Sequence, residues 1–426
     1  MRADRPAGGA LALPPHLRLT TLEELWAIPV GFDPHTEALP APRHTEPHGA
    51  PSHDDAAPGS QSTGSRGVPR SGRGPRAALE RVVLEGLRRP PCLVSFSGGV
   101  DSSVVLALTA HVARREGLAP PIPITNRFPG VDAADETEWQ ERVVAHLGVS
   151  DWVRLEWDHE LDMVGPVASM VLRRHGILVP FNGHFHYPLL ERAAGGSLLS
   201  GIGGDELFES VSRAAAARVL IQLRRPRPGE LRSLAFGVAP RRLRARIKAH
   251  TGRPRFERFQ WILPVRRAEL AAAHAAWESR DPLRVDRALR EWWWRSRVVQ
   301  CNLAGKRVLA ADFDVAMRHP FLDPNVLAAC AQAGGADGLG RGSRTRGFGL
   351  LAGDLLPPEV LARRSKASFD AAFCNRHMRA FAAGWDGAGI DLASVEVDAL
   401  RSEWLTPAPD AHSFALLQRA WLASHT

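Results

Sequence analysis

Between residues 77 and 208 short apolar segments alternate with longer segments of helical periodicity, and this alternation restricts the fold more than any other feature. Strands that alternate with helices form a parallel sheet covered by helices. We therefore predict a doubly wound parallel α/β sheet, with the mostly helical spacing that follows forming a helical subdomain over it. The apolar segments are 91–96, 120–128, 152–157 and 195–200, and helical spacing runs over 77–89, 102–117, 133–147, 161–176 and much of 209–426.

The chain before this region has a different composition. Residues 34–76 are rich in Pro, Gly, Ser, His and Arg, which is typical of a disordered linker. His44, His48 and His53 lie there without defined metal-ligand spacing, so we interpret them as solvated. The segment 20–33 is expected to order against the body. The predicted organisation is a partly disordered extension (1–76), an α/β core (77–208) and a mainly helical part (209–426).

The formal net charge of +8 comes almost entirely from arginine, because the only lysines are Lys248, Lys306 and Lys366. Such a bias, with abundant Ala, Gly and Pro, is typical of a GC-rich genome. We interpret the basic run 224–248 as a solvated face, with an acidic or peptide partner as the alternative, and we do not expect a nucleic-acid partner.

No apolar run approaches the roughly 20 residues of a membrane span. Prolines break the short apolar patch near the N-terminus, which argues against a signal peptide. We expect a cytoplasmic protein without a membrane partner. Cys92, Cys301, Cys330 and Cys374 are scattered without CxxC spacing, so neither a disulfide framework nor a zinc site is predicted.

The sequence SGGVDSS (97–103) directly follows the first apolar segment and opens a helix. Two glycines allow close backbone approach, and hydroxyl donors lie where the helix dipole favours an anion. Asp101 is itself an anion, and its place beside a phosphate is explained if a divalent cation bridges the two. The alternative is a simple helix cap, for which one residue suffices. We predict a nucleotide site of Ser97, Gly98, Gly99, Asp101, Ser102 and Ser103, without the lysine of a Walker loop.

A second glycine loop, SGIGGDELF (200–208), follows the fourth apolar segment. Asp205 and Glu206 open the helix after it, where two carboxylates can also serve only to complement the helix dipole. The carboxyl ends of parallel strands meet at one edge of a sheet. We therefore expect Asp101 and Asp205 to lie close enough to share one Mg²⁺.

The first loop resembles the pyrophosphate loop of the N-type ATP pyrophosphatases, which split ATP between its α and β phosphates. SGIGGDELF is similar to the SGEGSDE segment of the asparagine synthetase superfamily. PFLDPNV (320–326) and LPPEVLARRSKASF (356–369) are similar to its PFLD and LP…R..K..F elements, in the same order. The resemblance covers roughly residues 77–370. It implies the α/β fold of the ATP-pyrophosphatase type, ATP and Mg²⁺ as cofactors, and activation of a substrate carboxylate.

The resemblance also implies a role for each matching residue. The residues of the first loop would cradle the β and γ phosphates, and the two aspartates would hold Mg²⁺. Lys366 would neutralise the charge that develops at the α-phosphate, which suits a compact ammonium. Glu206 is a candidate base, with helix capping as the alternative. The nucleotide would also meet Ser95, Ser200, Gly201 and Gly203.

Departures from the superfamily pattern narrow the range of possible substrates. Arg2 stands where asparagine synthetases have the nucleophilic cysteine of a glutaminase domain, so we do not expect this chain to hydrolyse glutamine. Ile202 stands where SGEGSDE has a glutamate, which removes a carboxylate suited to free aspartate. The relatives that join a substrate's own amine and carboxylate include β-lactam synthetases and lasso-peptide macrolactam cyclases.

We therefore expect an AMP-forming amide ligase that acts on a lasso-type or other secondary-metabolite peptide. A precursor peptide would be its substrate, and a protease or leader-binding protein a partner. The alternatives are an ammonia-dependent asparagine synthetase, a tRNA-modifying pyrophosphatase, and a non-catalytic nucleotide-binding subunit. Three consecutive tryptophans, Trp292 to Trp294, are interpreted as core packing rather than as a substrate platform.

Overall fold

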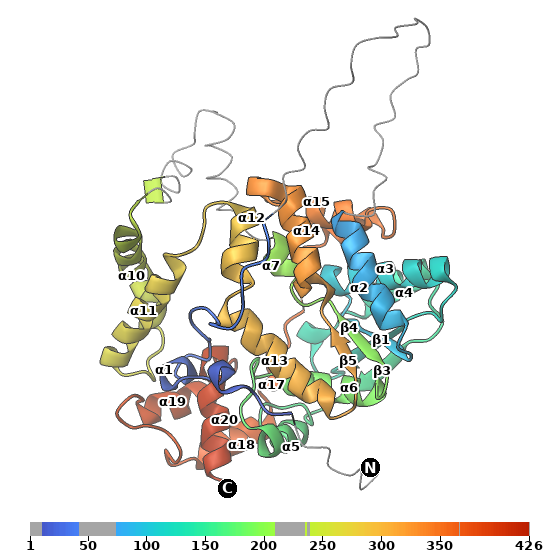
Figure 1. The fold of residues 1–426 in the computed structure, drawn as a ribbon. Helices are drawn as coiled ribbons and strands as arrows, with labels where there is room; N and C mark the ends of the chain where they lie inside the picture. The colour runs from blue at the N-terminus through green and yellow to red at the C-terminus, as the bar shows by residue number, and fades with distance from the viewer. Residues whose placement is uncertain (1–10, 42–73, 209–234, 237–238, 366, 426) are drawn as a thin grey trace, which may run out of the picture.

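A five-stranded parallel sheet in the order β3-β2-β1-β4-β5 forms the centre of the computed structural model (Figure 1). The structure describes residues 11–41, 74–208, 235–236, 239–365 and 367–425. Most of the predicted linker, the start of the basic run at 224–248, and Lys366 lie outside these ranges. The strands are β1 (Cys92–Ser95), β2 (Ile122–Arg127), β3 (Val153–Glu156), β4 (Ser197–Ser200) and β5 (Ala316–Arg318).

The strand order reverses at β1. The chain passes from β1 to β2 and β3 on one side, and then returns to place β4 on the other side of β1. Ser95, the last residue of β1, lies opposite Ser200, the last residue of β4. In doubly wound sheets the crevice at such a reversal, beyond the carboxyl ends of the strands, is where ligands bind.

Alternate residues of each central strand face opposite layers, as the period of two requires. Val94 and Leu199 pack with helices on one face, and Leu93 and Leu198 pack with helices on the other. The first face is covered by α2 (Pro75–Leu87), α3 (Val100–Glu116), α14 (Pro324–Gly334) and α15 (Arg344–Ala352). The second is covered by α5 (Pro166–His175), α6 (Tyr187–Arg192) and α13 (Arg297–Ala311).

Two helix ends follow the sequence signals closely. Gly117 and Gly148 adopt left-handed φ values of +65° and +60° at the ends of α3 and α4 (Thr137–Leu147). This conformation has little steric cost for glycine and closes the last helical turn.

Three features differ from the sequence prediction. Helix α5 begins at Pro166 rather than near residue 161, because the buried Asp162 accepts backbone hydrogen bonds from Val164, Asn375 and Met378. The helical spacing over 284–310 contains a break. A π-helical turn, Ala288–Trp293, precedes α13, whose first turn is capped by the Ser296 side chain. Strand β5 was not predicted, because it has only three residues.

A second core packs the segment around α1 (Thr21–Glu24) against helices close to the C-terminus, in the lower part of Figure 1. Trp26, which follows α1, is fully buried there together with Trp261 and Trp404. The remaining helices are α7 (Gly204–Phe208), α10 (Arg241–Glu257), α11 (Pro264–Glu278), α12 (Val285–Arg287), α16 (Pro358–Ala362), α17 (Asp370–Phe373), α18 (Arg376–Gly384), α19 (Val397–Trp404) and α20 (Phe414–Ala423).

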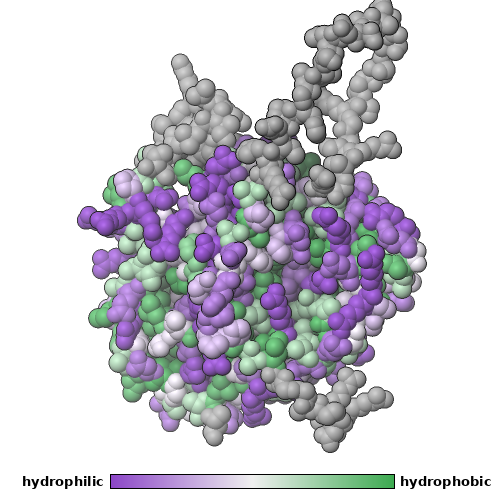
Figure 2. Space-filling view, in the orientation of Figure 1, coloured by the Kyte–Doolittle hydropathy of each residue, from purple (hydrophilic) through white to green (hydrophobic). Residues whose placement is uncertain are grey.

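Hydrophilic and apolar residues are mixed over the face shown in Figure 2. Within the described ranges, no helix combines the length and the hydropathy that crossing a membrane demands.

Candidate active site

The first glycine loop leaves β1 at the reversal point and leads into α3. Gly98 has a φ of +86°, and a Cβ there would lie 2.9 Å from the Gln140 side chain, so both conformation and space require glycine. Ser102 Oγ donates to the Gly99 carbonyl at 3.0 Å and accepts from the Ser97 N–H at 3.2 Å. Ser103 Oγ donates to the same carbonyl at 2.9 Å. The serines therefore hold the loop in shape, and the start of α3 faces the crevice.

Residues distant in the sequence fix this loop from outside. Arg363 donates to the Gly98 carbonyl at 2.9 Å and forms a buried ion pair with Glu136. Its guanidinium also lies 4.7 Å from the centre of the Trp139 ring. Gln140 Nε2 donates to the Ser97 carbonyl at 3.1 Å. The loop conformation thus depends on α4 and on the segment after α16.

The second glycine loop packs directly against the first. A Cβ on Gly201 would lie 2.6 Å from the Ser102 nitrogen, and one on Gly204 would lie 2.2 Å from Asp101 Oδ1. Gly203 has a φ of +99° and closely approaches Leu322. These contacts explain why so many glycines occur here. They let the two strand-end loops meet without side chains between them.

The contact brings Asp101 and Asp205 to one point, about a hundred residues apart in the chain. A single nitrogen, Arg344 Nη2, lies 2.6 Å from Asp101 Oδ2 and 2.8 Å from Asp205 Oδ1. The guanidinium also lies 5.3 Å from the Phe348 ring centre. Two carboxylates that converge on one cationic nitrogen are placed to share one cation.

The donor set fits Mg²⁺. Mg²⁺ is usually held by one or two carboxylates, with phosphate oxygens and waters completing its coordination. Asp101 and Asp205 provide two carboxylates at the start of α3 and α7, where the phosphates of a nucleotide would lie. Within the described part of the chain, no group of three or more acidic, histidine or cysteine side chains forms an all-protein metal cage.

A cavity of about 150 Å³ opens beside the first loop, at the carboxyl ends of β1 and β2. Its walls are mainly apolar, and Asn126 and His186 add polar atoms. An apolar cavity with a few polar groups suits a flat heterocycle. The lining includes Ser95, Ser97, Phe128, Gln140, Phe185, Leu189, Phe369 and Phe373.

The wall on the β4 side of the crevice is apolar around Ile202. This side chain packs against Val299, Leu303 and Leu322, with Trp293 and Trp294 beside them. The tryptophans therefore contribute to packing, as the sequence suggested, but they also lie behind the second loop. A glutamate in place of Ile202 would point its carboxylate at apolar side chains of α13, so the substitution agrees with its surroundings.

Two predicted residues contribute less to this geometry. Glu206 is exposed and is the third residue of α7. Lys366 lies outside the described residues, although Arg363 and Ser365 just before it are fixed beside the first loop. The other predicted residues lie at the ends of β1 and β4, in the loops that follow them, or in the first turn of α3 or α7.

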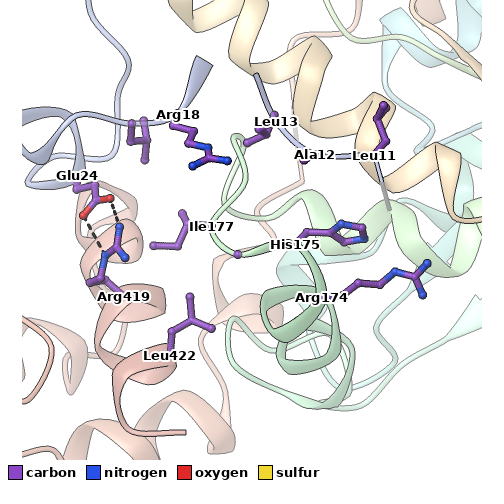
Figure 3. A pocket seen from close by; sticks show the side chains of 12 residues that line it. Leu11, Ala12, Leu13, Arg18, Glu24, Arg174, His175, Ile177, Arg419 and Leu422 are labelled. Atoms are coloured by element: carbon purple, nitrogen blue, oxygen red, sulfur yellow. Dashed lines mark hydrogen bonds and ion pairs between the residues drawn. The ribbon is translucent and has the colours of Figure 1, made fainter. Parts of the chain in front are cut away.

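A separate cavity of about 380 Å³ lies near α5 and α20, where Figure 3 shows its lining. Most of its charged side chains are already paired. Arg419 pairs with Glu24, and both Arg174 and His175 pair with Asp312 at 2.9 and 2.8 Å. Because neither strand-end loop lines this cavity, it is not the candidate active site.

Sequence reasoning missed several residues that the fold brings to the site: Glu136, Arg344, Arg363 and His319. Arg363 is the arginine of the LP…R..K..F pattern, so a signal for it was present. Arg344 and His319 stand in no motif that was assigned a role. Ser200 Oγ lies 2.6 Å from His319 Nδ1, immediately after β5.

None of the curated proteins compared with this chain gave a match. The family model for asparagine synthase matches residues 76–413, which is most of the chain and includes both glycine loops, Arg344 and Arg363. The match accounts for the parallel sheet and for the helices that complete it. The protein thus belongs to the asparagine synthase family and is an ATP-dependent ligase of the asparagine synthetase type.

Proposed function

We propose that the protein forms an amide bond by transferring AMP from ATP to a substrate carboxylate, with release of pyrophosphate, before an amine attacks the acyl-adenylate. The observation that carries this proposal is the meeting of two strand-end loops at the reversal point, with Asp101 and Asp205 converging on one position. A metal-bound pyrophosphate could lie against the start of α3 there, and the cavity beside β1 has the character expected for adenine.

Each part of the site then has a task. The N-terminus of α3 and the first loop bind the departing phosphates. Asp101 and Asp205 would hold Mg²⁺, which when bound offsets charge on the phosphate oxygens. Arg363 keeps the loop in its shape through the Gly98 carbonyl. Lys366 is proposed to stabilise charge at the α-phosphate, following the resemblance of its motif.

The substrate is proposed to be a peptide whose own amine and carboxylate are joined, as in a lasso-type macrolactam. The apolar wall around Ile202 supports this choice over free aspartate, whose α-amino and carboxylate groups need charged partners. The amine would attack within the same bound molecule, so the site need not bind ammonia.

The experiment is to incubate the protein with MgATP and candidate peptides, then separate the nucleotides and weigh the peptide. We expect AMP and a product lighter by one water. Asp205→Asn should abolish AMP formation, whereas Glu138→Gln, which removes an exposed carboxylate on α4, should not. ADP as the nucleotide product would overturn the proposal.

An ammonia-dependent asparagine synthetase is the second candidate, favoured by the family match. The same assay separates the two, because this enzyme would form AMP with aspartate and ammonium and would leave the peptides unchanged.

A further inference from the structure

A buried lysine on α13 lies toward the carboxyl ends of the strands, and the proposed function assigns it no role. Lys306, on α13, is 2% exposed. Among the described residues, none accepts a hydrogen bond from its ammonium group or forms an ion pair with it. Burial without an acidic partner lowers the pKa of Lys306 to about 7. Such an unpaired lysine indicates a place where an anion is accepted.

The neighbours of Lys306 along α13 locate its side chain. Leu309, one turn after it, packs with Leu198 of β4 in the core beneath the sheet. Leu303, one turn before it, packs with Ile202 in the second glycine loop. Residues three apart share one face of a helix. Lys306 therefore faces the carboxyl ends of the strands, at the level where β4 gives way to the loop.

Two histidines come to the same place from other elements. His319 follows β5, and its Nδ1 lies 2.6 Å from Ser200 Oγ. His186 ends the 3-10 turn Gly183–His186, which packs against α13, and borders the cavity at the end of β1. The buried Nδ1 atom of His186 has no hydrogen-bond partner among the described residues.

The titratable groups around this cluster are all basic residues. Burial is the main cause that lowers the pKa of His186 to about 3 and that of His319 well below its usual value, and the Lys306 charge adds to both shifts. His184 and Arg307 add smaller repulsions. Among the described residues no carboxylate compensates for these groups. A bound anion would compensate for these basic groups and would favour the protonated form of Lys306.

We propose that Lys306, His186 and His319 form a subsite that binds the carboxylate of the acyl substrate before it reacts. This inference rests on the proposed function, because it names the place where that carboxylate waits. The subsite lies at the ends of β4 and β5, while the phosphates are assigned to the loop after β1. A planar carboxylate can accept a hydrogen bond from the lysine and from an imidazole at once. When the carboxylate binds near neutral pH, Lys306 takes up a proton.

The chain offers a direct test, because it contains only three lysines. Protein labelled with ¹³C at the lysine Cε gives three signals, whose shifts report the protonation of each amine. Lys306→Met identifies the Lys306 signal by its loss. Lys248, paired with Glu278 at the surface, is the internal reference. Titrations are run with propionate as the carboxylate probe and with pyrophosphate as the phosphate probe.

We expect propionate to raise the apparent pKa of Lys306 by about one unit, which corresponds to roughly tenfold preference for the charged amine. Lys248 should not respond. His319→Gln retains a group that can hydrogen-bond Ser200 but lacks the basic ring, and it should reduce the shift. An unchanged Lys306 pKa with propionate, or a rise with pyrophosphate alone, would overturn the proposal. These signals do not depend on turnover, so the absence of AMP formation would count against the proposed function and not against the subsite.

Discussion

Arg344 occupies the position between Asp101 and Asp205 where the shared cation would bind, and replacing it tests that geometry. Arg344→Met keeps an unbranched side chain against Phe348 but removes the guanidinium. Two unit charges about 5 Å apart repel by about 3 kcal/mol at an effective dielectric constant of about 20. The side chains of Arg344, Asp101 and Asp205 are 22%, 21% and 31% exposed, so solvent reduces this value to about 1–3 kcal/mol.

The variant should therefore be less stable than the wild type without metal, and it should bind Mg²⁺ more tightly. In the wild type the metal must displace the Arg344 guanidinium from the two carboxylates. If the free energy of this displacement falls by about 1.4 kcal/mol, the Kd for Mg²⁺ becomes tenfold tighter. Calorimetric titration of Mg²⁺ into nucleotide-free protein measures this change. Arg346→Met, an exposed arginine of the same helix, is the matched control.

A second substitution makes the test more stringent. In Arg344→Met combined with Asp205→Asn, one of the two carboxylates is gone, and the gain in Mg²⁺ affinity should disappear. Unchanged or weaker Mg²⁺ binding in Arg344→Met alone would refute the reasoning, because it would show that the guanidinium and the metal do not compete for the two carboxylates.

Three further predictions concern the packing of the loops and the buried lysine. Gly204→Ala should weaken nucleotide binding at least tenfold, measured by calorimetry, because its Cβ would push the first-loop carboxylate away; Gly130→Ala, with open space around it, should not. Arg363→Met should cost about 3–5 kcal/mol in urea unfolding by leaving Glu136 buried alone, and adding Glu136→Gln should recover part of that loss. Lys306 is neutral when folded above pH 7 and charged when unfolded below pH 10.5. Wild-type stability relative to Lys306→Met should thus rise with pH across this window, and a flat difference would contradict the assigned burial.

The sequence predicted the parallel sheet and four of its strands because local signals mark them. Gly117 and Gly148 end helices in left-handed conformations, and buried apolar segments lie between polar loops. The meeting of Asp101 and Asp205 was also predictable, because both follow strands whose carboxyl ends share one edge. The family resemblance added the later motifs, and the asparagine synthase match confirms the family.

Other features depend on tertiary contacts that no local pattern records. Asp162 lies before the start of α5, which begins later than predicted, because its carboxylate accepts hydrogen bonds from a segment more than two hundred residues later. Arg344 reaches Asp101 and Asp205, the residues proposed to hold the metal, from α15 without a motif of its own. Lys306 looks like an ordinary helical lysine in the sequence, and only the packing of Leu303 and Leu309 shows that it faces the strand ends.

Transfer of oxygen from the substrate to AMP tests the central claim most directly. Aspartate and candidate peptides with ¹⁸O in their carboxylates are incubated with MgATP, and the nucleotide products are analysed by mass spectrometry. Attack of a carboxylate on the α-phosphate, followed by amide formation, leaves one substrate oxygen on AMP. We predict AMP that carries one ¹⁸O and unlabelled pyrophosphate. Label in inorganic phosphate together with ADP would contradict the account, because it would mean that the γ-phosphate had been transferred instead.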